Sequence, residues 1–180
     1  MRLIYLPTFW TVIADFIVWF IIHIGVVAIM IRIPAKYFDP NHWLYRGRRW
    51  ERKGNVYREV FKIKKWKQHL PDGAGVLGRL GFQKKQLNGT NPEYFRAFLI
   101  ETCRAELTHW IFILFAPFFF LWNRPGVGLF MIFYALLENL PFIIAQRYNR
   151  YRLRRLLEQN KLKGTSNNYQ FVTPAQAGVQ

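Results

Sequence analysis

The sequence predicts an all-α integral membrane protein with about three transmembrane helices and additional interfacial amphipathic segments. Hydrophobic residues make up 52% of the 180-residue chain. They gather in long runs at residues 9–31, 107–122 and 127–146, and a helix satisfies every backbone polar group of such a run inside hydrocarbon. Strongly basic stretches follow the first and the third run, and the formal net charge is +16.

Residues 9–31 form the clearest predicted span. This run is about 34 Å long at ~1.5 Å per residue, which is enough to cross a hydrocarbon core of roughly 30 Å. A cleaved signal peptide is the alternative, but the run contains Asp15 and His23 and no small-x-small cleavage site follows it. We expect Asp15 near the outer end of this helix, and the role of His23 stays open.

Residues 32–96 are basic and rich in aromatic side chains, with 16 Lys and Arg against five acidic residues. In a soluble domain this charge indicates nucleic acid, but beside long apolar runs it favours anionic membrane lipid, so we predict no nucleic-acid binding. Residues 147–157 combine leucines at helical spacing with many arginines, which predicts an amphipathic helix on the membrane surface. We expect one domain over residues 1–162 and a disordered polar tail over 163–180.

The distribution of positive charge predicts the topology. Three spans place the basic segment 32–96 and the basic residues after 146 on the same side of the membrane, and the positive-inside rule makes that side the cytoplasm. We therefore expect a multi-pass protein of the cell membrane, with the N-terminus and the turn at residues 123–126 outside.

A polar stretch at residues 100–110 leads into the second apolar run and is the first candidate site. Glu106 and His109 share one helix face with Thr102, while Glu101 and Arg104 share another. A carboxylate one turn from an imidazole can orient the ring and raise its basicity, as acyl or proton transfer requires. The alternative is a helix start with an interfacial histidine, and spacing alone leaves both open.

A second polar group lies at the end of the third run. Antiparallel packing of the second and third runs would place His109 level with residues 145–148, so four polar residues become its expected neighbours: Gln146, Arg147, Asn149 and Arg150. Asn139, beside Glu138 within the third run, should also face the protein interior. The alternative for the arginines is a basic flank that anchors the helix by snorkelling.

Several other chemistries find no support in the sequence. There is no H-x-x-x-x-D motif of glycerolipid acyltransferases, no Gly-x-Ser-x-Gly elbow, no P-loop and no dinucleotide fingerprint. Cys103 is the only cysteine, so an internal disulfide is excluded, and no Cys/His spacing suits zinc. We predict neither a metal nor a cofactor.

Four segments in chain order resemble a known family: Arg32-Ile-Pro-x-Lys-Tyr-Phe38, Lys65-Trp-Lys-x-x-Leu-Pro-Asp-Gly73, Glu101-Thr-x-Arg-Ala-Glu-Leu-x-His-Trp110, and Phe133-Tyr-Ala-x-x-x-Asn-x-Pro-x-Ile-Ile-x-Gln-Arg-Tyr-Asn-Arg-x-Arg-Leu153. The chain is similar over about residues 32–157 to the glycosyl-4,4′-diaponeurosporenoate acyltransferases, small membrane proteins of the staphyloxanthin pathway. The resemblance implies transfer of a fatty acyl group from a thioester, acyl-CoA or acyl carrier protein, to a sugar hydroxyl of a glycosylated carotenoid or related glycolipid.

The resemblance and the two polar groups together give a hypothesis for the site. His109 is the general base, Glu106 orients it, and Glu101 completes the catalytic set. Three arginines bind the donor phosphates or stabilise the oxyanion: Arg104, Arg147 and Arg150. Two asparagines, Asn139 and Asn149, position the substrate, and Gln146 is a further predicted substrate-binding residue. The acyl chain and the polyene are expected against a set of phenylalanines: Phe112, Phe115, Phe118, Phe119, Phe120 and Phe142.

Two alternatives from other classes remain at this point. One is a non-catalytic membrane protein that binds lipid or organises a pathway, and the other is an enzyme like the prenyl-lipid methyltransferases, for which no separate nucleotide-cofactor pocket is indicated. A chain of this size with three spans is also compatible with an oligomer that encloses a site.

Overall fold

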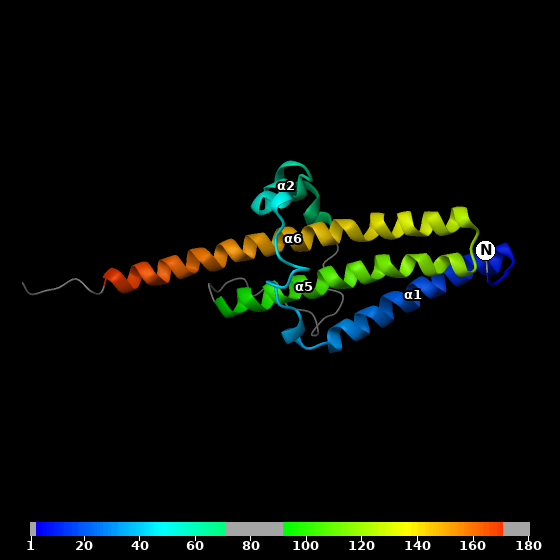
Figure 1. Ribbon diagram of the computed structural model, residues 1–180, viewed down its shortest axis with the longest axis horizontal. Coiled ribbons are helices and arrows are strands. Elements are labelled where there is room, and N and C mark those ends of the chain that lie inside the picture. Colours follow the sequence, from blue (N-terminus) through cyan, green and yellow to red (C-terminus); the bar gives the residue numbers. More distant parts are fainter. Residues whose placement is uncertain (1–2, 71–91, 171–180) are drawn as a thin grey trace, which may run out of the picture.

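The computed structural model describes residues 3–70 and 92–170, with the backbone alone over residues 161–170. Three long helices lie side by side and alternate in direction (Figure 1): α1 (Thr8–Arg32), α5 (Pro92–Phe115) and α6 (Pro125–Gln170). Prolines lie at the boundaries of these helices. α1 ends just before the extended Ile33-Pro34 pair, and a proline is the first residue of both α5 and α6.

Three helical stretches are long and apolar enough to cross a membrane: Thr8–Arg32, Pro92–Leu121 and Pro125–Asn160. No strand occurs in the part of the chain that the structure describes. The predicted all-α membrane fold is therefore confirmed. Residues 71–91, which include the end of the second family motif, lie outside the described residues.

Pro117 changes the helix type instead of producing a simple kink. The α-helix ends at Phe115, and a 3-10 helix, η6 (Ala116–Leu121), continues to the turn. Proline has no N–H and its ring crowds the carbonyl four residues before it, so the tighter i to i+3 pattern replaces the α-helical one here. A 3-10 helix also rises faster per residue than an α-helix, and this sets the register discussed below.

The third run and the basic segment after it form one helix. α6 passes through Pro141 without a break and includes residues 147–157, which the sequence predicts as a separate amphipathic helix. Leu153 is buried against Phe95 and Leu99 of α5, so this part of α6 packs on protein. The helix extends to Gln170 and thus includes the first residues of the expected tail, while residues 171–180 lie outside the described residues.

Between α1 and α5, the chain up to residue 70 folds as short helices beside the bundle. They comprise η1 (Ala35–Tyr37), η2 (Arg49–Gly54), α2 (Asn55–Glu59), α3 (Ile63–Trp66) and η3 (Lys67–His69). Figure 1 shows α2 on the flank of α6, near the middle of the molecule. Tyr57, Ile63 and Ala145 form the buried contact between this group and α6.

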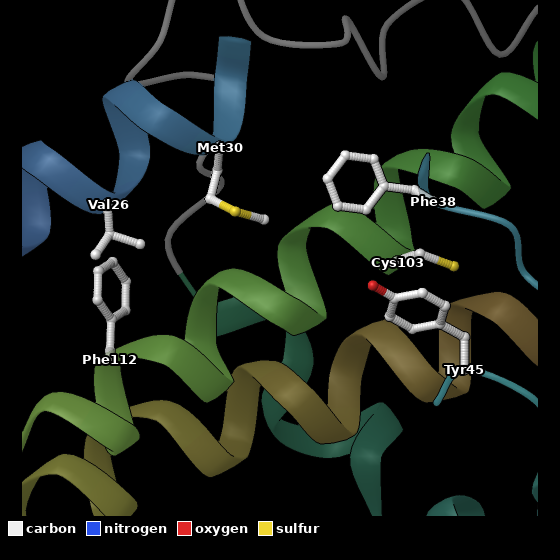
Figure 2. Packing of buried hydrophobic residues seen from close by; sticks show 6 residues of the cluster. All are labelled: Val26, Met30, Phe38, Tyr45, Cys103 and Phe112. Atoms are coloured by element: carbon white, nitrogen blue, oxygen red, sulfur yellow. The ribbon is translucent and has the colours of Figure 1, made fainter. Parts of the chain in front are cut away.

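Apolar contacts hold α1 against α5 along much of its length. Figure 2 shows Val26 of α1 facing Phe112 of α5, with Phe38 and the ring of Tyr45 close to Cys103. At the other end of the bundle, a second buried cluster joins α1, η6 and α6: Trp19, Ala116, Phe119, Trp122 and Ala135.

Asp15 is part of the buried structure at this second end. Only 6% of its surface is exposed, and one carboxylate oxygen accepts hydrogen bonds from Trp122 Nε1 at 2.8 Å and Asn123 Nδ2 at 2.7 Å. The sequence placed Asp15 near the outer end of the first helix but did not predict this role. Asp15 joins α1 to the turn between η6 and α6.

Candidate active site

Glu106 of α5 pairs with two arginines of α6. Its side chain is completely buried. Arg147 Nε lies 2.7 Å from one carboxylate oxygen and Arg150 Nη2 lies 2.6 Å from the other. The two guanidinium groups therefore hold both ends of a single carboxylate between the helices.

The remaining nitrogens of these two arginines also have acceptors within the protein. Arg147 Nη1 contacts Glu51 at 2.7 Å and its Nη2 donates to a backbone carbonyl at 3.0 Å. Arg150 donates to the hydroxyl and carbonyl oxygens of Thr102 and to the carbonyl of Tyr45. Because every nitrogen of both guanidinium groups is engaged, this geometry favours a structural role for them over the substrate binding that the sequence predicts.

Glu51, in η2, is the centre of the other half of this network, and sequence reasoning did not single it out. It is fully buried and accepts hydrogen bonds from the hydroxyls of Tyr57 and Tyr151, the backbone N–H of Arg48 and the guanidinium of Arg147. It is also the single acidic residue between positions 40 and 58. A single carboxylate within a stretch of Lys and Arg residues is the sequence signal that could have identified Glu51.

Two glycines allow Tyr151 to reach Glu51. A Cβ built at Gly47 would lie 2.1 Å from the Tyr151 hydroxyl oxygen, and one at Gly54 would lie 3.0 Å from its Cβ. Gly54 also has a φ of 90°, which side chains rarely adopt. The loop is therefore shaped to bring Glu51 onto α6. We name the set Glu51, Glu106, Arg147 and Arg150 the carboxylate–arginine network.

The environment of Glu51 leads to a prediction for acid stability. Burial by itself raises the pKa of this carboxyl, but hydrogen bonds from Tyr151, Tyr57, Arg48 and Arg147 outweigh it and hold the pKa below 4.5. A carboxyl with a lowered folded-state pKa stabilises the fold above about pH 4.5, and this contribution is lost as the pH falls through the folded-state pKa. We expect the stability gap between wild type and Glu51→Gln to narrow as the pH falls below about 4.5.

Thermal unfolding of the two proteins in detergent across pH 3–7 measures this gap. Using the difference between the proteins removes the contribution of the other carboxyl groups. A gap that stays constant down to pH 3 would contradict the prediction.

His109 lies in a separate cluster, which also involves α6. Its Nδ1 is 2.8 Å from Asn139 Oδ1, and Asn139 Nδ2 donates to the Ala135 carbonyl at 2.9 Å. Because the amide nitrogen is engaged with a carbonyl, the amide oxygen faces His109 and requires a proton on Nδ1. The lone pair of His109 Nε2 is then free to accept a proton. Phe142 fixes the plane of the ring, with centroids 4.7 Å apart and an interplanar angle of 12°.

His23 of α1 and Glu138 of α6 complete this cluster. His23 Nδ1 lies 2.8 Å from the Trp19 carbonyl and its Nε2 lies 3.8 Å from Glu138 Oε1. The other oxygen of Glu138 is buried without a hydrogen-bond partner among the described residues. Phe112 stacks on His23 at 4.2 Å and meets His109 edge-on at 5.9 Å. We name His23, His109, Glu138 and Asn139 the histidine cluster.

Comparison with known proteins identifies the family. The family model described as glycosyl-4,4′-diaponeurosporenoate acyltransferase matches residues 40–159. The chain belongs to this acyltransferase family. Both the carboxylate–arginine network and the pair of His109 and Asn139 lie within the matched residues, whereas His23 lies outside them.

Curated relatives agree with this assignment. Two proteins named glycosyl-4,4′-diaponeurosporenoate acyltransferase, from Staphylococcus aureus strains MRSA252 and bovine RF122 / ET3-1, are each 37% identical over 147 residues. The alignments cover 81% of this chain and 87% of the relatives. A third, from strain Newman, is 35% identical over the same length. No solved structure matches the chain. The resemblance that the four sequence motifs indicate is thus confirmed.

In this acyltransferase the predicted single site divides into two. Glu106 accepts hydrogen bonds from Arg147, from Arg150 and, at 3.4 Å, from Trp110 Nε1. Among the described residues, the partner of the His109 Nδ1 atom is Asn139. The expectation that Glu106 orients His109 therefore has no contact behind it among the described residues, where Asn139 is the partner of the His109 nitrogen.

The predicted and the observed neighbours of His109 differ because of the register between α5 and α6. His109 is level with Asn139 and Phe142 instead of residues 145–148. The turn begins immediately after Leu121, and η6 rises about 2.0 Å per residue, so the distance from His109 to Leu121 and that from Pro125 to Asn139 are both about 21 Å. His109 consequently lies about six residues of α6, or about 9 Å at ~1.5 Å per residue, deeper in the apolar part of the bundle than predicted.

The other predicted site residues lie outside the histidine cluster. Glu101 and Arg104 form the expected i, i+3 pair at 3.1 Å, and Arg104 also donates to the carbonyls of Met30 and Ile33 at the end of α1. Asn149 accepts a hydrogen bond from Lys67 of η3.

The structure does not assign Gln146 to either group. This residue is half-buried, and no hydrogen bond joins it to another residue of the described chain. Of the predicted site residues, His109 and Asn139 are thus the two that the structure brings together in a geometry suited to proton transfer.

Proposed function

We propose that this acyltransferase moves a fatty acyl group from an acyl thioester to a sugar hydroxyl of a glycosylated carotenoid or a related glycolipid. The observation that carries the proposal is the His109–Asn139 pair, which leaves His109 Nε2 free to accept a proton. The acceptor class follows from the names of the relatives, and the general-base role follows from the chemistry of the histidine cluster.

The proposed reaction uses His109 twice. Nε2 removes the proton of the acceptor hydroxyl as its oxygen attacks the thioester carbonyl carbon, which forms a tetrahedral intermediate. The intermediate then collapses, the C–S bond breaks, and Nε2 returns the proton to the leaving sulfur. The products are the ester and the free thiol. The Asn139 oxygen accepts the Nδ1 hydrogen bond throughout and stabilises the imidazolium that exists between the two steps.

The surroundings of His109 suit an apolar acceptor. Of the phenylalanines predicted to contact substrate, Phe112 and Phe119 are buried in the packing of the bundle, whereas 54% of the surface of Phe118 is exposed. Phe115 and Phe142 are half-buried near the same helices. A polyene or acyl chain in the leaflet could therefore lie along this aromatic surface and bring a polar head to the histidine cluster.

We propose that the basic end of the bundle faces the cytoplasm of a cell membrane. The short helices after α1 pack against α6 close to its arginine-rich part. Together these segments carry most of the cationic residues, and the positive-inside rule therefore supports this orientation. The thioester donor, acyl-CoA or acyl carrier protein, would then approach from the cytoplasm while the acceptor approaches from the leaflet.

Product analysis tests the proposed function. We expect the purified protein in lipid nanodiscs to convert a glycosylated C30 carotenoid acid and an acyl thioester to an ester, detected by mass spectrometry. Acyl-CoA and acyl carrier protein are supplied in separate reactions, and heat-inactivated protein is the control. Absence of the ester with both donors, from a protein that remains folded, would contradict the proposal and favour a lipid-binding or scaffold role.

A further inference from the structure

A cavity of about 650 Å³ lies between α6 and the short helices that follow α1, apart from both clusters described above. This volume falls in the range of about 300–1,000 Å³ that is usual for small-molecule and cofactor sites. Its lining comes from η2, α2, α3, η3 and α6: Gly54, Arg58, Lys64, Lys67, Gln68, Tyr148, Tyr151, Arg152, Arg155, Leu156 and Gln159.

The charge of the cavity lining is entirely positive. Five cationic residues and no carboxylate line it. Within residues 3–70 and 92–160, no ion pair engages Arg58, Lys64, Arg152 or Arg155. Arg147 and Arg150, by contrast, are neutralised by Glu51 and Glu106. Positive charge concentrated in a concave site attracts phosphate groups, and the arginine fork matches their oxygens.

Two tyrosines make part of the wall suitable for an aromatic base. Tyr148 and Tyr151 line the cavity, and the Lys67 ammonium group lies 5.4 Å from the centre of the Tyr148 ring. Tyr151 is held by its hydrogen bond to Glu51 and by packing on Gly54. A nucleotide site needs cationic groups that bind the phosphates and aromatic rings on which the base can stack, and this cavity has both.

We infer that this cavity binds the nucleotide phosphates of a coenzyme A thioester, the acyl donor. The inference rests on the proposed function and assigns to the cavity the donor-phosphate role that the sequence gave to Arg104, Arg147 and Arg150. Tyr148, which lines the cavity, is six residues along α6 from Phe142, which stacks on His109. These six residues span about 9 Å at ~1.5 Å per residue, a distance that an extended pantetheine arm covers.

The test measures binding of coenzyme A itself to the full chain in nanodiscs of uncharged lipid by isothermal titration calorimetry. We expect the double variant Arg152→Gln/Arg155→Gln and the single variant Lys64→Ala each to bind coenzyme A at least tenfold more weakly than wild type. Lys65→Ala is the matched control, because Lys65 is the exposed neighbour of Lys64 and does not line the cavity. It should bind coenzyme A as wild type does.

Binding to vesicles of phosphatidylglycerol separates a nucleotide from a lipid headgroup. Variants that keep vesicle binding and lose coenzyme A binding support the inference. Variants that lose vesicle binding and keep coenzyme A binding overturn it, as does equal coenzyme A affinity in all proteins. Turnover with acyl carrier protein alone, without coenzyme A binding, also overturns it.

The binding test is independent of the proposed function. Coenzyme A binding at this cavity without ester formation would leave the site in place and reject the acyl transfer. Ester formation from acyl-CoA with an unchanged KM in the double variant would retain the acyl transfer and reject the site.

Discussion

Replacing His109 by alanine is expected to lower kcat for ester formation by about 10²–10⁴, the contribution typical of a general base. The physical reason is the geometry of the histidine cluster: Asn139 holds the proton on Nδ1 and leaves Nε2 as the acceptor. KM for the acyl thioester should change little, because His109 has no part in the proposed phosphate site. Steady-state kinetics on purified protein, with matched amounts of folded enzyme, provides the measurement.

Two further variants separate chemistry from structure. Asn139→Ala should lower kcat by less than His109→Ala, since the imidazole remains but loses its fixed tautomer. His42→Ala is the control, because His42 is an exposed histidine outside both clusters, and it should retain wild-type kcat. If His109→Ala turned over at the wild-type rate, His109 could not be the base and the assignment of the histidine cluster would fall.

Replacing Glu106 by alanine should cause the largest loss of stability among the predicted site residues. The substitution removes contacts of 2.7 Å to Arg147 and 2.6 Å to Arg150, so that Arg150 has no carboxylate partner and Arg147 keeps only Glu51. Breaking a buried ion pair by removing one partner costs about 3–5 kcal/mol, because the remaining charge stays buried and unpaired. We expect a marked fall in the midpoint of thermal unfolding in detergent and reduced accumulation in membranes.

Glu101→Ala is the matched control on the same helix. Glu101 pairs with Arg104, but 34% of its side chain is exposed, and such pairs contribute about 0.2–1 kcal/mol. Its unfolding midpoint should stay close to wild type. If Glu106→Ala unfolds like Glu101→Ala yet has lost turnover, the carboxylate–arginine network acts in catalysis and not in stability.

Much of the fold could be predicted from residues alone. Apolar runs of membrane length predict three long helices, and the structure contains them. The polar pairs within one helix were also predictable, because i, i+3 and i, i+4 spacing follows from helix geometry. The contact between Glu101 and Arg104 is an example.

The residues that were missed lie in the short helices between α1 and α5. Glu51 and the cations of the cavity come from η2, α2, α3 and η3, where no regular periodicity relates sequence position to burial. Three residues there other than glycine, Arg52, Lys53 and Lys62, have positive φ values, which spacing rules do not anticipate. Their positions depend on contacts with α6, about 90 residues further along the chain.

The apolar runs and the four family motifs were enough to predict a helical membrane acyltransferase. They also drew attention to the polar stretch at residues 100–110, to Asn139 and to residues 146–150. Which of these residues contact one another could be learned only from the packing of the helices in three dimensions. Helical periodicity defines the faces of each helix but not the register between two helices, and here a tight turn and the 3-10 rise of η6 set that register. This register places His109 beside Asn139, and it places Glu106 beside Arg147 and Arg150. The proposed site of proton transfer is therefore separate from the carboxylate–arginine network that stabilises the fold.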